Sequence, residues 1–198
     1  MRPASSIVRS LLATLGALGL AVSVACGGGG GGSSPATASS LDYTAPSGVG
    51  PTEYQFVKNA ASTNTHLILD LMGPATPTTG HGVSFELSAS PSKITWVNGV
   101  NEGTTTSTFN LGAAPKLLKS RLAAANANLQ AGLFQKVTVT PAATLDGTHA
   151  LAQIALDLKA GATVGDAALA VVASKAFITN ATGDPTPITV KVGSLQAK

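Results

Sequence analysis

Apolar and polar residues alternate along several short stretches after residue 65. The clearest case is 82–89, where Val83, Phe85 and Leu87 point one way while Glu86 and its neighbouring serines point the other. Alternation with a period of two predicts strands that bury one face. The same pattern predicts strands at 66–72, 93–97, 108–111, 137–140, 149–159, 167–173, 175–179 and 188–192.

Two stretches fit either a strand or a helix. In residues 149–159 the leucines and Ile154 also fit a helical stripe, but the short length and the flanking Gly147 and Gly161 favour a strand. The other stretch is residues 115–136. Its alanines, leucines and basic residues favour a helix, and Pro115 suits a first helical turn. Against a helix, Asn126 and Asn128 lie in the middle, where a turn would fall, and the residues after them alternate. We favour a hairpin and keep the helix as the alternative.

Turn signals rich in glycine and proline separate these stretches, and none of them demands a helix. About eight or nine short strands spaced in this way predict an all-β fold, an antiparallel β-sandwich. We assign it to residues 65–198. Residues 41–64 are expected to be an irregular lead-in, because Pro46, Pro51 and nearby glycines interrupt them, with Tyr54 and Phe56 packing on the domain edge.

The N-terminal 25 residues have the features of an export signal. Arg2 and Arg9 precede an apolar run, residues 11–25, that is too short to span a bilayer as a helix. Ala25 then precedes Cys26, the only cysteine of the chain. This junction resembles the lipobox of bacterial lipoproteins, although Ser23 stands where that family usually has leucine. The resemblance implies that Cys26 becomes the N-terminal residue and carries fatty acyl chains such as palmitate, which anchor the protein in a membrane.

Residues 26–40 are expected to be a flexible tether. After Cys26 come six glycines and then serine, alanine and threonine, a composition that buries nothing on ordering. Such a chain spans roughly 20 Å. In enterobacterial lipoproteins, aspartate after the lipidated cysteine favours the inner membrane; Gly27 therefore favours the outer membrane and places the protein in the cell envelope.

Charge and composition bound the function further. The sequence holds 12 Lys and Arg against 9 Asp and Glu, and removing Arg2 and Arg9 leaves 10 against 9, a net charge of +1. Basic residues are scattered apart from a small group at Lys116, Lys119 and Arg121, so we expect no nucleic-acid partner. With Cys26 acylated, no disulfide can form.

No catalytic, metal-binding or cofactor-binding motif is evident. His66, His81 and His149 lie far apart and match no metal-ligand spacing, and no phosphate loop or nucleophile elbow occurs. Carbohydrate binding usually needs exposed aromatic rings. Trp96 shares a strand face with Ile94 and is expected in the core. We therefore expect no enzyme, no catalytic residues, no metal and no cofactor.

Two segments carry a resemblance to a known fold family. Residues 85–94 (FELSASPSKI) and residues 146–156 (DGTHALAQIAL) are similar to strand motifs of cohesin-like domains, relatives of some carbohydrate-binding modules. Residues 177–183 and 188–193 fit their closing strands. The resemblance implies a jelly-roll type sandwich that binds other proteins through a sheet face. We expect a membrane-anchored protein-interaction or assembly module, with a carbohydrate-binding module at the cell surface as the alternative.

Overall fold

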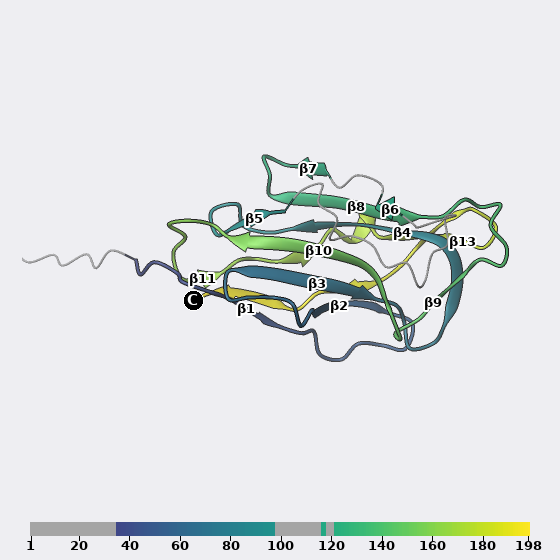
Figure 1. The fold of residues 1–198 in the computed structure, drawn as a ribbon, viewed down its shortest axis with the longest axis horizontal. Coiled ribbons are helices and arrows are strands. Elements are labelled where there is room, and N and C mark those ends of the chain that lie inside the picture. The colour runs from purple at the N-terminus through teal and green to yellow at the C-terminus, as the bar shows by residue number, and fades with distance from the viewer. Residues whose placement is uncertain (1–34, 98–115, 118–120) are drawn as a thin grey trace, which may run out of the picture. The chain divides into compact units, whose positions relative to one another are not determined.

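The computed structural model describes residues 35–97, 116–117 and 121–198. Strands make up nearly all of its regular structure (Figure 1). They are β1 (Leu41–Thr44), β2 (Tyr54–Lys58), β3 (His66–Met72), β4 (Thr78–Ser88), β5 (Ile94–Trp96), β6 (Lys116–Leu117), β7 (Arg121–Ala123), β8 (Asn128–Phe134), β9 (Ala143–Leu145), β10 (Ala150–Leu158), β11 (Gly165–Asp166), β12 (Ala170–Val171), β13 (Phe177–Asn180), β14 (Pro185–Pro187), β15 (Val190–Lys191) and β16 (Ser194–Ala197). One turn of 3-10 helix, η1 (Ala173–Lys175), precedes β13.

The strands form two main sheets and one small sheet. The first main sheet has the order β14-β13-β4-β8-β6, with β7 also paired to β8, and β9 and β12 paired to β4. The second has the order β15-β2-β3-β10-β5, and β1-β16-β11 form the small sheet. Pairing is antiparallel except between β15 and β2. The expected all-β antiparallel sandwich is therefore confirmed.

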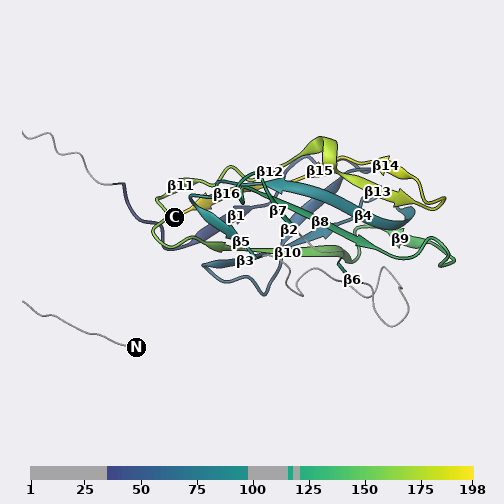
Figure 2. The same ribbon diagram turned by 90° about the horizontal axis from the view of Figure 1, so that it is seen from above.

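The two main sheets pack face to face, with β4 and β8 in one layer and β3 and β10 in the other (Figures 1 and 2). Each sheet buries one side of its alternating strands. On β4 the buried apolar residues are Val83, Phe85 and Leu87, as the sequence pattern predicts, and on β3 they are three leucines. The rings of Phe56 and Phe85 meet edge to face across the layers, with centroids 5.2 Å apart. The hydrophobic core thus lies between the sheets and leaves two outer faces.

The segment left open between helix and hairpin is a hairpin in its described part. β7 and β8 pair antiparallel, with Leu122 opposite Leu129. The turn between them places Ala124, Ala125 and Asn126 at φ values of 49°, 53° and 68°. Three successive residues in the left-handed region end the strand abruptly, which no helix could tolerate.

Residues 41–64 differ from the irregular lead-in that we expected. They contain β1 and β2, and Tyr54 and Phe56 lie in the centre of the core, not at its edge. The prolines and glycines between them form the connecting loop. The described end of the expected tether is also attached to the domain, because Ala38 N–H donates to Ala162 O (2.7 Å) and Ser39 N–H to Lys198 O (2.6 Å).

One strand prediction in the second half is wrong, and another holds over only part of its length. Residues 137–140 form a turn, closed by a hydrogen bond from Val139 N–H to Lys136 O, and Val137 is exposed. Within 167–173 only β12 pairs with a neighbour, and the chain then enters η1. Ala167 and Leu169 of the second stretch are buried as its alternation predicts, but only its end joins a ladder.

Several predictions lie outside the described residues. These are the signal segment 1–25, Cys26 with most of its tether, and the edge strand at 108–111. Within the described part, no helix is long and apolar enough to cross a membrane.

Candidate functional site

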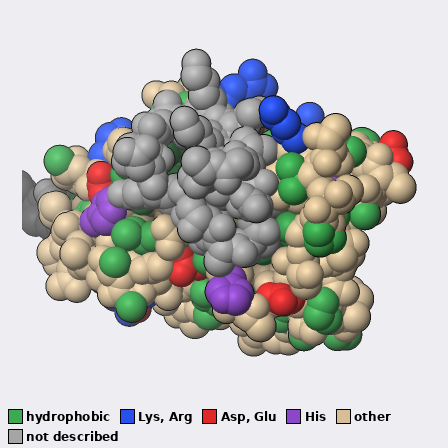
Figure 3. Space-filling view, turned by 45° about the vertical axis from the view of Figure 1, so that its right-hand side comes forward, with side chains coloured by type: hydrophobic (Ala, Val, Ile, Leu, Met, Phe, Trp, Pro, Cys, Tyr) green, Lys and Arg blue, Asp and Glu red, His purple; other side chains and the backbone are tan. Residues whose placement is uncertain are grey.

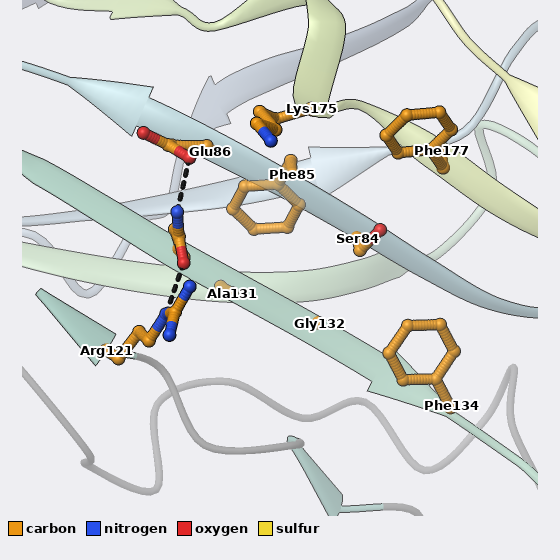
Figure 4. A pocket seen from close by; sticks show the side chains of 10 residues that line it. Ser84, Phe85, Glu86, Arg121, Ala131, Gly132, Phe134, Lys175 and Phe177 are labelled. Atoms are coloured by element: carbon orange, nitrogen blue, oxygen red, sulfur yellow. Dashed lines mark hydrogen bonds between the residues drawn. The ribbon is translucent and has the colours of Figure 1, made fainter. Parts of the chain in front are cut away.

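A groove of about 330 Å³ opens on the outer face of the sheet formed by β4, β8 and β13 (Figure 4). Its volume lies at the lower end of the range for ligand pockets, so it suits a few side chains or a small molecule. The lining residues come from these strands, from β7 and from η1. They are Ser84, Phe85, Glu86, Arg121, Gln130, Ala131, Gly132, Phe134, Lys175 and Phe177.

A buried carboxylate forms one end of the groove. Glu86 alternates with the core residues of β4 and so points to the outer face, yet it is only 6% exposed. Asn128 Nδ2 donates to its Oε1 and Gln130 Nε2 to its Oε2, each at 2.6 Å. Both amides come from β8, where Gln130 stands directly opposite Glu86. The antiparallel register therefore satisfies both oxygens of the buried carboxylate, as burial requires.

The side-chain amide of Gln130 also binds an arginine. Gln130 Oε1 accepts a hydrogen bond from Arg121 Nε, and Gln130 is the residue paired with Arg121 on the neighbouring strand. Arg121 is exposed. Its guanidinium is thus fixed by a neutral side chain, and its terminal amino groups make no hydrogen bond or ion pair with any described residue.

An aromatic ring lies flat on glycines at the other end of the groove. Gly82 on β4 stands directly opposite Phe134 on β8. A Cβ at Gly82 would lie 2.0 Å from Cδ1 of Phe134, and one at Gly132 would lie 2.7 Å from Cε2. The ring therefore occupies the space that both glycines leave, and Phe134 is half-buried. The two glycines seat the ring against the sheet.

The third side of the groove comes from β13 and η1. Phe177 pairs with Ser84 of β4, and its half-buried ring faces the same outer side as Phe134 (Figure 4). Lys175 ends the single turn of η1 and is exposed. Its side-chain amine makes no hydrogen bond or ion pair with any described residue. The groove therefore combines two phenyl rings with two cations.

The outer face of the other sheet is organised differently. His66 Nδ1 of β3 lies 2.5 Å from Asp157 Oδ1 of β10, and Asn59 Nδ2 donates to Asp70 Oδ2 at 2.7 Å. The register places His66 opposite Asp157. These polar side chains are paired with one another.

Two buried oxygens of this second sheet have no hydrogen-bond partner among the described residues. They are Tyr54 Oη and Asp70 Oδ1. Burial raises the pKa of Tyr54 to about 12. Burial also raises the pKa of Tyr43, an effect that the N–H of Gly193 opposes by donating to its oxygen. Because Tyr43 also donates to Phe56 O at 2.9 Å, its hydroxyl is satisfied while that of Tyr54 is not.

Of the residues singled out from the sequence, Arg121 lines the groove, whereas Trp96 does not. Cys26 is outside the described residues, so lipidation stays a prediction. Trp96 is 3% exposed and its Nε1 donates to Ala127 O at 3.1 Å, which confirms the expected core position. The carbohydrate-binding alternative thereby loses the aromatic residue on which it rested.

The other two histidines have surroundings of their own. His81 is buried between Gln135 Nε2 and Ala181 O, each at 3.2 Å, and His149 is exposed near Thr148. Within the described ranges, no three His, Cys, Asp or Glu residues are close enough to hold a metal. The acidic side chains on the face shown in Figure 3 lie apart from one another. Glu86 is the single carboxylate among the lining residues of the groove.

No protein-family model matches the chain, and no curated protein sequence matches it. Solved structures do match its fold. The sixth cohesin of scaffoldin B from Acetivibrio cellulolyticus, solved in complex with a Cel5 dockerin mutant, is 14% identical with a TM-score of 0.50; the match covers 72% of this chain and 95% of that one. The second type II cohesin of the ScaA scaffoldin from the same organism is 9% identical with a TM-score of 0.50, covering 74% and 90%. The chain is a cohesin-like β-sandwich.

Proposed function

We propose that this protein is a non-enzymatic, membrane-anchored interaction module of the cell envelope that binds a partner protein through the groove face of β4, β8 and β13. The observation that carries the proposal is the groove itself. It places two half-buried phenyl rings, Phe134 and Phe177, beside two cations that have no charged partner in the described structure. Aromatic and arginine side chains dominate the energetics of protein interfaces.

The groove offers little to a catalytic mechanism. General acid–base or glycosidic chemistry needs a second titratable group near the first. Glu86 has both oxygens bound to amides and no second carboxylate among the residues that line the groove with it. A binding role uses the same residues without requiring a proton transfer.

The fold supports a binding role by analogy. One of the matching cohesins was solved with a dockerin bound. Because identity is low, the analogy concerns the scaffold, and the binding face of this chain is argued from its own groove. The membrane anchor rests on the lipobox-like residues that end at Cys26, and the outer membrane on Gly27.

Photo-crosslinking in cells tests the binding face. Benzoylphenylalanine replaces Phe177 in the groove and, as a control, Gln153 on the outer face of β10. We expect one protein to be captured from the Phe177 position alone. That protein, once purified, should bind the unmodified chain and lose affinity for a Phe177→Ala variant. Equal capture from both positions contradicts the proposal.

Membrane fractionation tests the anchor separately. Cys26→Ala removes the sulfur that the acyl chain would occupy. We expect the variant to leave the membrane fraction, because stable attachment needs the acyl chains. A variant that stays in that fraction as fully as the natural protein contradicts lipid anchoring.

A further inference from the structure

In the groove, the amide of Gln130 connects Arg121 to the buried carboxylate of Glu86. A buried carboxylate next to an arginine would normally form a direct ion pair and use the guanidinium's donors. Here Gln130 stands between them, accepting from Arg121 Nε and donating to Glu86 Oε2. The arginine is therefore oriented by the acid through a neutral amide. Its two terminal amino groups bind no residue in the described part of the chain, which leaves them for another ligand.

The charges near the groove are unbalanced in favour of cations. Arg121 and Lys175 are exposed, and Glu86 is buried with both oxygens occupied. The sum over these three is +1. An incoming cation finds no free carboxylate among the described lining residues, whereas an incoming anion finds a guanidinium whose free edge suits a bidentate carboxylate.

The aromatic rings of the groove indicate which group of the ligand lies beside its carboxylate. Phe134 and Phe177 present half-buried rings on the same face (Figure 4). The ring of Phe134 lies against the two glycines beneath it and presents its other face outward. A ligand that fills the groove therefore carries an apolar group close to its anion.

On the basis of the proposed function, we infer that the groove recognises a protein segment in which an Asp or Glu side chain lies next to an aliphatic or aromatic one. The carboxylate binds the free edge of Arg121, with Lys175 adding attraction. The apolar side chain packs against Phe134 and Phe177. Gln130 and Glu86 act as positioning residues for the arginine.

A phage-displayed library of random peptides, panned on the full-length protein in detergent, tests the inference. We expect the selected peptides to be enriched in Asp or Glu beside apolar residues. Their affinity should fall about tenfold for Arg121→Gln and less for Lys175→Gln, because loss of a charge-assisted bidentate contact exceeds loss of a point charge. Lys58→Gln, an exposed cation on β2 of the other sheet, is the matched control and should leave affinity unchanged.

Two results separate this inference from the function on which it rests. In the first result, binding is weakened by Phe177→Ala, but the selected peptides lack acidic residues or bind Arg121→Gln as well as the natural protein. This result contradicts the recognition of an acidic side chain and still supports the groove as the interaction face. The exposed rings would then bind an apolar partner, which could be a second copy of this chain. Selected peptides that bind Phe177→Ala and Arg121→Gln as well as the natural protein overturn both.

Discussion

The two main sheets satisfy their polar side chains in opposite ways. In the sheet of β4, β8 and β13, the buried Glu86 has both oxygens hydrogen-bonded, while the surface cations Arg121 and Lys175 have no charged partner in the described structure. In the sheet of β2, β3 and β10, the surface acid Asp157 is paired with His66, while the buried Tyr54 hydroxyl has no partner.

The polar side chains of one face are paired with each other, whereas the cations of the groove face are available to a ligand. Polar groups that pair within a face need nothing from outside. Cations held in place without an opposite charge keep their interaction energy available for a partner. A buried oxygen without a hydrogen bond, by contrast, lowers stability and offers nothing to a ligand. The contrast therefore supports our proposal that the partner binds to the groove face.

The largest expected loss of stability comes from adding a side-chain atom at Gly82, beneath the ring of Phe134. A Cβ at Gly82 would meet the ring at 2.0 Å and the carbonyl oxygen of Leu133 at 2.8 Å. We expect Gly82→Ala to lower the free energy of unfolding by about 3 kcal/mol, because both the ring and the backbone must shift. Urea denaturation measures it. At Gly147 the nearest atom to an added Cβ is 3.5 Å away, so Gly147→Ala is the control, and equal losses for both variants would contradict the seating of the ring.

The second largest expected effect is a loss of stability at high pH, caused by the buried hydroxyl of Tyr54 in the other sheet. The pKa of Tyr54 is raised to about 12 in the folded protein, against an ordinary value near 10 in the unfolded chain. Between these values the unfolded state binds fewer protons, so stability is full below pH 10 and falls as pH rises towards 12. The loss should approach 2–3 kcal/mol.

Tyr54→Phe isolates this contribution. The variant should lose less stability than the natural protein between pH 9 and 12, and at pH 8 it should be more stable by about 1 kcal/mol, because the unsatisfied hydroxyl is gone. Urea denaturation across pH measures both. Identical pH profiles would show that the hydroxyl is satisfied in the folded protein.

Removing the buried carboxylate of the groove should have a smaller effect. Glu86→Ala leaves the side-chain amides of Asn128 and Gln130 without their acceptor, and both are only half-buried, so water replaces part of the loss. We expect about 2 kcal/mol less stability. Thermal denaturation measures it. A variant as stable as the natural protein would mean that the carboxylate does not hold the amides.

The surface pair of the other sheet should contribute least. Asp157 is 49% exposed and His66 31%. We expect Asp157→Asn to change the free energy of unfolding by less than about 1 kcal/mol, as exposed ion pairs do. A loss as large as that of Glu86→Ala would remove the distinction between the two faces.

The sequence was informative where a strand buries one face. The alternation of 82–89 predicted β4 and its inward and outward residues. The position of Trp96 on the same strand face as Ile94 predicted that the tryptophan is buried. It failed for β1 and β2, where the prolines and glycines of the connecting loop hid two short strands. The partner of β1, β16, also lies at the other end of the chain.

The groove could not be derived in the same way. Glu86 is recognisable as an outward residue of β4, but its partners depend on which residue of β8 stands opposite. Arg121 belongs to the one basic group in the sequence, which gave the only signal for it. The ring of Phe134 over Gly82 likewise depends on cross-strand register, which periodicity does not encode.

Thiol labelling in intact cells tests the central claim, that the groove face carries the partner, most directly. Cys26 is the only natural cysteine and is expected to be acylated, so Ser84→Cys in the groove and Gln153→Cys on the opposite face each add one reactive thiol. We expect a maleimide to label Ser84→Cys more slowly in cells than in the purified protein, and Gln153→Cys equally in both. Labelling of Ser84→Cys at the same rate in cells and after purification would contradict the account.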